Sequence, residues 1–346
     1  GKAIVFERDF KVWYYDIASG NASAIKINKR GAAATPVAEH VKLTNTFREL
    51  SVSGDGKKAA FIARGDVFVA ATKDGGDAVR ITATTGIESQ ISWAKNSNSM
   101  VYISDRDGPS HIFEYNFITK TETRITNSDL NDGSARFSPD GKLLSYIRNG
   151  NQLRVMNVAT KKDELITTAY TGIAPFFQSD YTWSPDGNWI AFASLGNNSF
   201  RNINVVAATG GQSRPVSFLP NSFGGDVSWS KDGKFILFTT SQRTESSSVA
   251  RIDLVPQTPV FKEDDFKKLF TDTTAKKDTA AAVKATTDNV KSGKDKEASK
   301  IIWEGIKDRL TFLPLDVDVS DHALSPDGKT LAVIATQAGQ ENVFTY

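Results

Sequence analysis

An acidic residue recurs three positions before an apolar or aromatic anchor at four places in this chain. These acids are Glu49, Asp180, Asp226 and Asp321, and Gln90 and Ser134 hold the same position before two further anchors. Carboxylates gathered around one opening attract amines and cations. Short acids in crowded strands also accept backbone N–H bonds. The spacing therefore supports two hypotheses, an acidic collar that binds ligands and a set of structural hydrogen-bond acceptors.

The anchors belong to a repeat that must position these acids. Each anchor precedes Ser-Pro-Asp-Gly or a relative of it, and a run of alternating apolar residues follows. The six anchors are Val52, Trp93, Phe137, Trp183, Trp229 and Leu324, at steps of 41, 44, 46, 46 and 95 residues. Pro presets φ, Asp caps the turn with its side chain and Gly adopts positive φ. The signature therefore predicts a β-hairpin turn in every repeat.

Four short strands per repeat, with a period of about 45 residues, predict an all-β fold of the β-propeller type. We expect seven blades, with six as the alternative, because Gly1-Lys2 before Ala3-Ile-Val-Phe6 resembles the end of a further turn. The first and last blades then lack a strand each, which predicts an unlatched seam between them. In a propeller the strand before the turn is the innermost. The four acids would thus lie near one mouth of the axial channel.

The predicted domain organisation is a single propeller over residues 1–346, with an insertion at residues 256–300. The last step between anchors exceeds one repeat by about the length of another. Within the insertion, acids at the start and lysines near the end of Glu263–Phe270 predict two turns of helix. The remainder is polar without apolar periodicity, which indicates a solvated excursion. A partner-docking arm is the alternative.

Residues for catalysis are scarce. The three histidines, His40, His111 and His322, fall in different repeats without a second metal ligand at a suitable spacing. Gly-x-Ser-x-Gly and phosphate-loop motifs are absent from the sequence, and Asp105–Gly108 indicates a tight turn. We therefore expect no catalytic residue, no metal and no cofactor in this segment. A propeller enzyme with its site in the channel is a weaker hypothesis.

Composition limits the classes of partner that the chain could bind. The chain has 42 basic and 40 acidic residues, a net charge of +2 and no basic stripe, which argues against nucleic acid. The apolar runs are strand-sized, which argues against a membrane span. There is no cysteine, so disulfides are excluded. Richness in Asn, Ser and Thr favours an exported or periplasmic protein, with the cytoplasm as the alternative.

Several segments resemble the second, seven-bladed propeller of tricorn-type serine proteases. The resemblance covers most of the chain. It runs over Phe47–Leu254, with Gly65–Val69, Thr182–Gly187 and Arg251–Pro259 as its distinctive parts, and continues beyond the insertion in Ile301–Leu310 and Leu313–Leu315. The Ser-Pro-Asp-Gly turns alone are shared with TolB-like propellers. No segment matches the PDZ-like or protease modules of the family, so no catalytic residue is carried over.

The resemblance implies a supporting role. We expect a non-catalytic propeller segment of a tricorn-like peptidase, which filters or guides oligopeptides to or from a protease core outside this chain. PDZ-like and protease domains of the same parent chain would then be its partners. The alternative is a free-standing TolB-like propeller that binds a protein partner across one face.

Overall fold

The computed structural model describes ten segments of the chain. They are residues 1–8, 11–27, 47–73, 75–169, 181–196, 199–222, 224–242, 245–257, 299–325 and 327–346. Asp180, His40 and the predicted helix Glu263–Phe270 lie outside them, as do residues 258–298 of the predicted insertion. The prediction of an all-β chain is confirmed, since the described residues form antiparallel sheets with one short 3-10 helix, η2 (Ile306–Arg309).

The strands form seven antiparallel sheets, each built from neighbours in the chain. The first three sheets are β1 (Ala3–Arg8), β2 (Lys11–Asp16), β3 (Asn21–Ala24); β4 (Phe47–Val52), β5 (Lys58–Ala63), β6 (Asp66–Ala71), β7 (Val79–Arg80); and β8 (Glu88–Trp93), β9 (Ser99–Ser104), β10 (His111–Asn116), β11 (Thr121–Arg124). The next two are β12 (Asp132–Phe137), β13 (Leu143–Arg148), β14 (Gln152–Asn157), β15 (Asp163–Thr168); and β16 (Tyr181–Trp183), β17 (Trp189–Leu195), β18 (Arg201–Ala207), β19 (Arg214–Pro215). The last two are β20 (Ser228–Trp229), β21 (Phe235–Thr240), β22 (Ser248–Asp253), β23 (Leu310–Phe312); and β24 (Asp318–Leu324), β25 (Leu331–Gln337), β26 (Gln340–Thr345).

The Ser-x-Asp-Gly signature forms the same hairpin turn wherever it occurs. In the first copy the Gly56 N–H donates to the Ser53 carbonyl at 2.8 Å, and the Ser53 hydroxyl donates to Asp55 at 2.6 Å. Asp55 also accepts the Lys57 N–H, and the Ser53 hydroxyl accepts the Lys58 N–H. The hydroxyl bond is the main reason why the pKa of Asp55 is lowered. The turn is therefore stabilised by its own side chains.

The second repeat reaches the same turn without glycine. Ser97 stands where the other repeats have Gly and adopts a φ of +57°. Its N–H donates to the Ala94 carbonyl at 2.9 Å, as the glycine does elsewhere. The Ser97 hydroxyl accepts the Asp55 N–H from the preceding turn at 3.1 Å. A glycine would adopt this positive φ without strain but could not accept the Asp55 N–H, which explains the serine.

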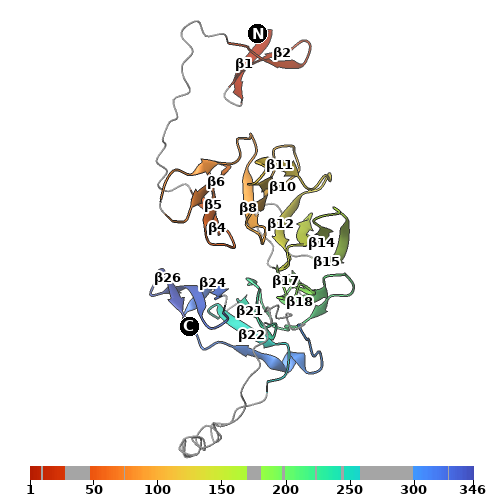
Figure 1. Ribbon diagram of the computed structural model, residues 1–346, viewed down its shortest axis with the longest axis vertical. Coiled ribbons are helices and arrows are strands. Elements are labelled where there is room, and N and C mark those ends of the chain that lie inside the picture. The colour runs from red at the N-terminus through yellow and green to blue at the C-terminus, as the bar shows by residue number, and fades with distance from the viewer. Residues whose placement is uncertain are drawn as a thin grey trace, which may run out of the picture.

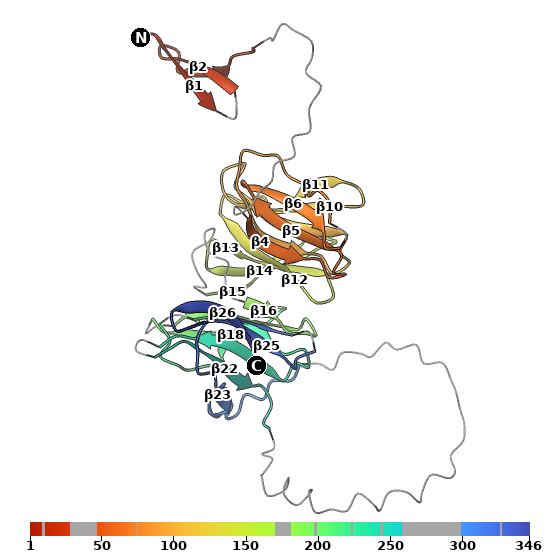
Figure 2. The same ribbon diagram turned by 90° about the vertical axis from the view of Figure 1, so that its left-hand side faces the viewer.

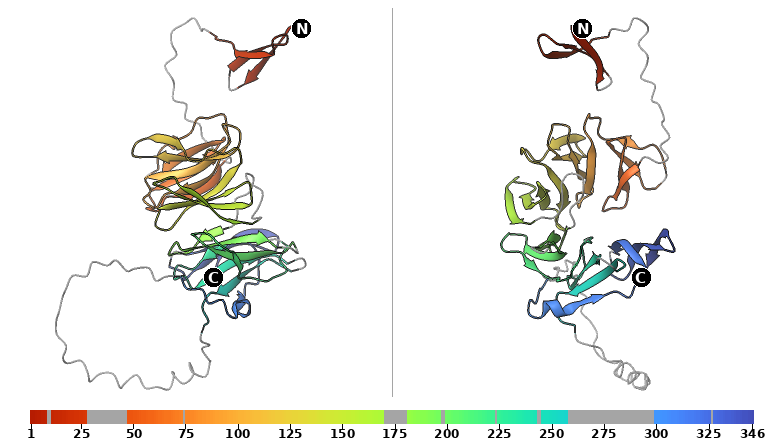
Figure 3. Two further views of the ribbon diagram at one scale, coloured as in Figure 1. Left: turned by 90° about the vertical axis from the view of Figure 1, so that its right-hand side faces the viewer. Right: turned by 180° about the vertical axis from the view of Figure 1, so that it is seen from behind.

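Six of the sheets, from β4 to β26, follow one another along an arc (Figure 1). Consecutive sheets share a hydrophobic core, and each of five clusters of buried residues lies between two neighbours. The β4–β7 and β8–β11 sheets, for example, bring Ile62 and Val67 against Tyr102 and Phe113. The β1–β3 sheet lies apart from this arc in all views (Figures 2 and 3).

The arc is also bound by side chains that follow the insertion. Ile301 and Trp303 pack on the core between the fourth and fifth four-stranded sheets, and the Trp303 ring lies under Arg214 at 3.9 Å. The Ile302 N–H donates to the Leu254 carbonyl at 2.9 Å. The two described flanks of the insertion therefore meet at one point of the sheet edge.

Candidate binding site at the inner-strand ends

Most of the six positions that lie three residues before the anchors coincide with a backbone irregularity. Left-handed φ values occur at four of them, Glu49 (+53°), Gln90 (+57°), Ser134 (+56°) and Asp226 (+42°). The pairing register of β4, β8 and β12 shifts at the same residues, and that of β24 shifts beside Asp321. Such a bulge re-aims the side chain that carries it. The repeat therefore places one specially directed side chain near the start of most inner strands.

In the first half of the arc these side chains bind the next sheet. The Glu49 carboxylate accepts the backbone N–H of Gln90, and the Gln90 side-chain oxygen accepts the N–H of Ser134 at 2.5 Å. Partial burial raises the pKa of Glu49, although the Gln90 N–H opposes this. Glu49 and Gln90 thus each supply an acceptor to the equivalent residue of the following sheet.

In the second half the carboxylates bind within their own sheets. Asp226 accepts the Thr239 hydroxyl at 2.9 Å, and Asp321 accepts the N–H of the adjacent His322 at 2.6 Å. Burial and then the negative charge of Asp226 raise the pKa of Asp321. The structure therefore brings Asp226 and Asp321 together, places Glu49 at the other end of the arc, and leaves Asp180 outside the described residues.

A pocket of about 590 Å³ adjoins Glu49 between the first two four-stranded sheets. Its lining includes Glu88, which is 1% exposed and was not among the predicted site residues. One oxygen of Glu88, Oε1, accepts bonds from Thr84 at 2.7 Å and Ser104 at 3.0 Å and forms an ion pair with Arg106 at 3.3 Å, whereas Oε2 has no partner. Burial raises the pKa of Glu88. Arg48 and Arg64 also line the pocket, so it offers both signs of charge.

The sequence carries one signal for Glu88, its spacing from the anchor. It lies five residues before its anchor Trp93, as Asp132 does before Phe137. Asp132 is buried and forms an ion pair with Arg148 at 2.7 Å. Because two repeats carry an acid there, the position indicates a second acidic column, and in the fold both acids pair with an arginine, Glu88 with Arg106 and Asp132 with Arg148.

His322 and Ser228 form a serine–histidine contact that the sequence did not reveal. The Ser228 hydroxyl lies 2.8 Å from His322 Nε2, although the residues are 94 positions apart. The other ring nitrogen has no hydrogen-bond partner, and the neighbouring Asp321 binds backbone instead. Burial lowers the pKa of His322 to about 4, so the ring is neutral at pH 7. The contact joins two sheets and lacks the orienting carboxylate of a catalytic triad.

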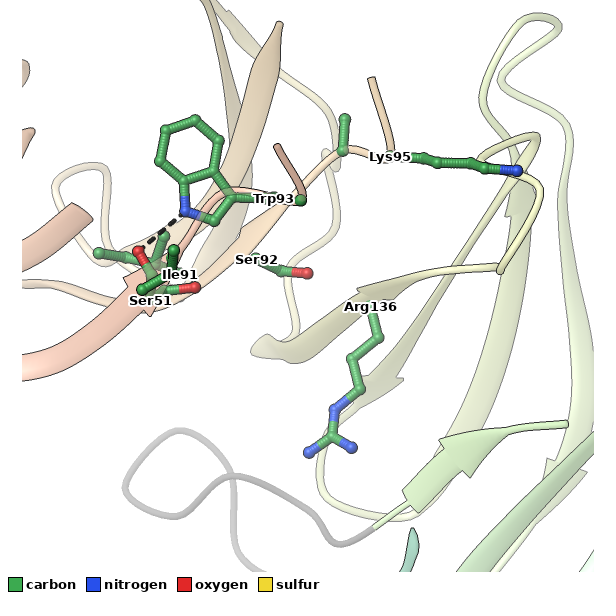
Figure 4. Close-up of a pocket in the computed structure, with 9 residues that line it drawn as sticks. Ser51, Ile91, Ser92, Trp93, Lys95 and Arg136 are labelled. Atoms are coloured by element: carbon green, nitrogen blue, oxygen red, sulfur yellow. Dashed lines mark hydrogen bonds between the residues drawn. The ribbon is translucent and has the colours of Figure 1, made fainter. Parts of the chain in front are cut away.

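The opposite ends of the inner strands carry a second pocket, of about 390 Å³ (Figure 4). The Trp93 indole donates to the Ser51 carbonyl at 3.0 Å and so ties two sheets together. Arg136 extends in a different direction and binds the carbonyl and ring of Tyr181, with 4.8 Å to the ring centre. Lys95 completes a lining that is basic, in contrast to the acidic residues at the strand starts.

Comparisons with known proteins support the fold. Residues 50–180 match the family model of the TolB beta propeller domain. A tricorn-like protease C-terminal subunit of Sulfurisphaera tokodaii is 22% identical over 249 residues, which cover 72% of this chain and 28% of the relative. The chain thus spans little more than a quarter of that protein's length.

Two solved structures show the same fold. The tricorn protease gives a TM-score of 0.55 at 13% identity, covering 100% of this chain and 37% of that one. Oligogalacturonate lyase from Vibrio parahaemolyticus gives 0.56 at 10% identity, covering 100% and 86%. Identities this low show the fold alone. No helix in the described part of the chain is long and apolar enough to cross a membrane. The propeller prediction is confirmed: the chain is an all-β propeller protein that carries a TolB-like segment and resembles the propellers of tricorn-type proteases.

Proposed function

We propose that this chain is a non-catalytic propeller segment of a tricorn-like peptidase, and that it guides oligopeptides to or from a protease core outside this chain. The observation that carries the proposal is the pair Asp226 and Asp321 at the starts of two neighbouring inner strands. Burial, followed by the negative charge of Asp226, raises the pKa of Asp321, so a positive charge placed beside the pair would favour its ionised form. The amino terminus or a lysine of a peptide would supply that charge.

Three further features support the proposal. The pocket beside Glu49 and Glu88 combines carboxylates with the apolar side chains of Phe47 and Ile87, which suits a peptide better than a bare cation. Both carboxylates have raised pKa values. The similarity to a tricorn-like protease subunit supplies the protease context. Asp180 remains part of the proposed collar.

A free-standing TolB-like interaction propeller is the second candidate, because residues 50–180 match the TolB model. The two candidates differ in what the acidic residues bind. A peptide guide captures short peptides through their amines, whereas an interaction propeller binds a folded partner over a broad face and has little affinity for a short peptide.

The test is a titration with two fluorescent decapeptides that differ only at the amino terminus, one free and one acetylated. The free peptide should bind more tightly, and its affinity should fall with added salt. The double variant D226N/D321N should lose the preference. E164Q, which removes one negative charge from the exposed part of the outer strand β15, should keep it. Equal binding of the two peptides by the unmodified chain would refute the guiding role.

A further inference from the structure

The six sheets of the arc leave two faces uncovered. The outward face of the β4–β7 sheet carries Phe47, Phe61 and Phe68, whose rings contact one another at centroid distances of 5.2 and 5.9 Å. Phe47 is 51% exposed. At the other end, Ile334 and Val343 are paired on the outward face of the β24–β26 sheet, and Val343 is 70% exposed. No cluster in the described residues joins these two sheets.

The β1–β3 sheet is apolar on both faces. Ile4 and Phe6 share one face with their partners Tyr15 and Trp13, and the Phe6 and Trp13 rings stack at 6.4 Å. Val5 lies on the other face with its partner Tyr14. Ile4 and Val5 are 52% and 61% exposed. A sheet with two apolar faces is suited to lie between two others, and three short strands alone are marginally stable.

The five existing interfaces follow a fixed rule. In each strand after a turn, the residues three and five positions beyond the turn glycine face the preceding sheet, as Ile190 and Phe192 do after Gly187. The residues four and six positions beyond it face the following sheet, as Ala191 and Ala193 do. The turn without glycine obeys the same rule when counted from Ser97, with Met100 and Tyr102 facing back and Val101 and Ile103 facing forward.

Counted from Gly1, this rule assigns both faces of the β1–β3 sheet. Val5 is four positions beyond Gly1 and faces the following sheet, β4–β7. Ile4 and Phe6 are three and five positions beyond it and face a preceding sheet. Counted from Gly328, Ala332 and Ile334 of β25 are the residues that face a following sheet, and they lie on its uncovered side.

We propose that the β1–β3 sheet docks between β24–β26 and β4–β7, with Ile4 and Phe6 against Ile334 and Val343, and Val5 and Tyr14 against Phe47 and Phe61. This closes the arc into a ring. The connection is long, since the chain from Ile27 to Phe47 reaches up to roughly 70 Å when fully extended. The alternative occupant of the two faces is the β1–β3 sheet of a second copy.

The absence of cysteine makes a cross-linking test specific, because every thiol is an introduced one. Phe6→Cys with Ile334→Cys should be joined within one chain by a short bismaleimide. Val5→Cys with Ile334→Cys is the matched control, since the neighbouring residue points to the opposite face. With Phe61→Cys as the common partner the order of rates should reverse, so that Val5→Cys gives the matching pair and Phe6→Cys the control. Docking raises the effective concentration of the thiols, so each matching pair should react at least about tenfold faster than its control.

Equal rates for matching and control pairs would overturn the proposal. Cross-linked dimers whose yield grows with protein concentration would overturn it in favour of the second copy. Amide exchange gives a measurement that needs no cysteine. Amides of β1 and β2 should be protected in the unmodified chain and lose at least about tenfold of that protection in I334D/V343D, because the buried face is gone. I118D, at a 72% exposed position, is the control. Unprotected β1–β3 amides in the unmodified chain would also refute docking.

Discussion

The two halves of the arc use the same backbone position in different ways. From β4 to β15, Glu49 and Gln90 use their side-chain oxygens to accept an N–H from the next sheet. From β20 to β26, Asp226 and Asp321 bind within their own sheets, and burial followed by the charge of Asp226 raises the pKa of Asp321. A glutamate or glutamine is long enough to reach the neighbouring strand, whereas an aspartate is one methylene shorter. Side-chain length thus separates a bonded half, which holds sheets together, from a charged half, which is suited to ligands.

The largest expected effect concerns pH and the charged half. Burial lowers the pKa of His322 to about 4 from its ordinary value of 6.5. Between these values the unfolded chain binds a proton that the folded chain does not, so the free energy of unfolding falls as the pH falls. The loss through His322 should reach about 3 kcal/mol at pH 4.

The measurement is urea unfolding of the unmodified chain and H322Q from pH 7 to pH 4. The carboxylates are common to both chains, so the difference between the two curves isolates His322. Parallel curves would show that His322 takes up its proton at the same pH in the folded and the unfolded chain.

A second prediction tests the hydrogen bonds that join the sheets of the bonded half. Gln90→Ala removes the acceptor of the buried Ser134 N–H and should lower the free energy of unfolding by about 2 kcal/mol. Gln340→Ala, at an exposed position beside a turn, is the control and should change it little. Chemical denaturation at pH 7 measures both. If Gln90→Ala lowers the free energy of unfolding no more than Gln340→Ala does, the bond from Ser134 to Gln90 does not hold the two sheets together.

A third prediction concerns the predicted insertion, whose described flanks lie in the charged half. Its described flanks meet where the Ile302 N–H binds the Leu254 carbonyl. Replacing residues 258–298 by an eight-residue Gly-Ser linker should therefore keep the sheets intact and raise the free energy of unfolding by about 1 kcal/mol through the shorter loop. Circular dichroism and thermal unfolding test this. Loss of the β-sheet signal would mean that the replaced residues contribute to the core.

The smallest expected effect concerns the interaction between the two carboxylates of the charged half. Burial is the largest cause of the raised pKa of Asp321, and the charge of Asp226 is the second. Asp226→Asn removes this second cause, so the pKa should fall part of the way towards its ordinary value. Stability at pH 7 should rise by less than about 1 kcal/mol, as for other partly exposed charge pairs. Carboxyl carbon NMR of Asp321 follows the titration. An unchanged Asp321 titration would mean that the two carboxylates do not interact.

Much of the fold could be predicted from the sequence because its determinants are local. The Ser-x-Asp-Gly turns depend on contacts within five residues, and the alternating strands that follow depend on a period of two. The acidic column could be located for the same reason. The partner of each acid could not be predicted, because it depends on bulge geometry and on the neighbouring sheet. Glu88 and the contact between Ser228 and His322 could not be predicted from the sequence for the same reason.

The shared cores also bear on how such a chain folds and how it changes in evolution. Since every hydrophobic cluster of the arc belongs to two consecutive sheets, no sheet buries its apolar faces alone. The smallest cooperative unit is thus a pair of neighbours, and stability should propagate along the arc from one sheet to the next, as in repeat proteins. Docking of the β1–β3 sheet would give the two end sheets a second neighbour each, so a chain without that sheet should open first at its ends. A duplicated or deleted repeat keeps every surviving interface matched, so the number of repeats can change in whole blades while the sequence of each blade is preserved.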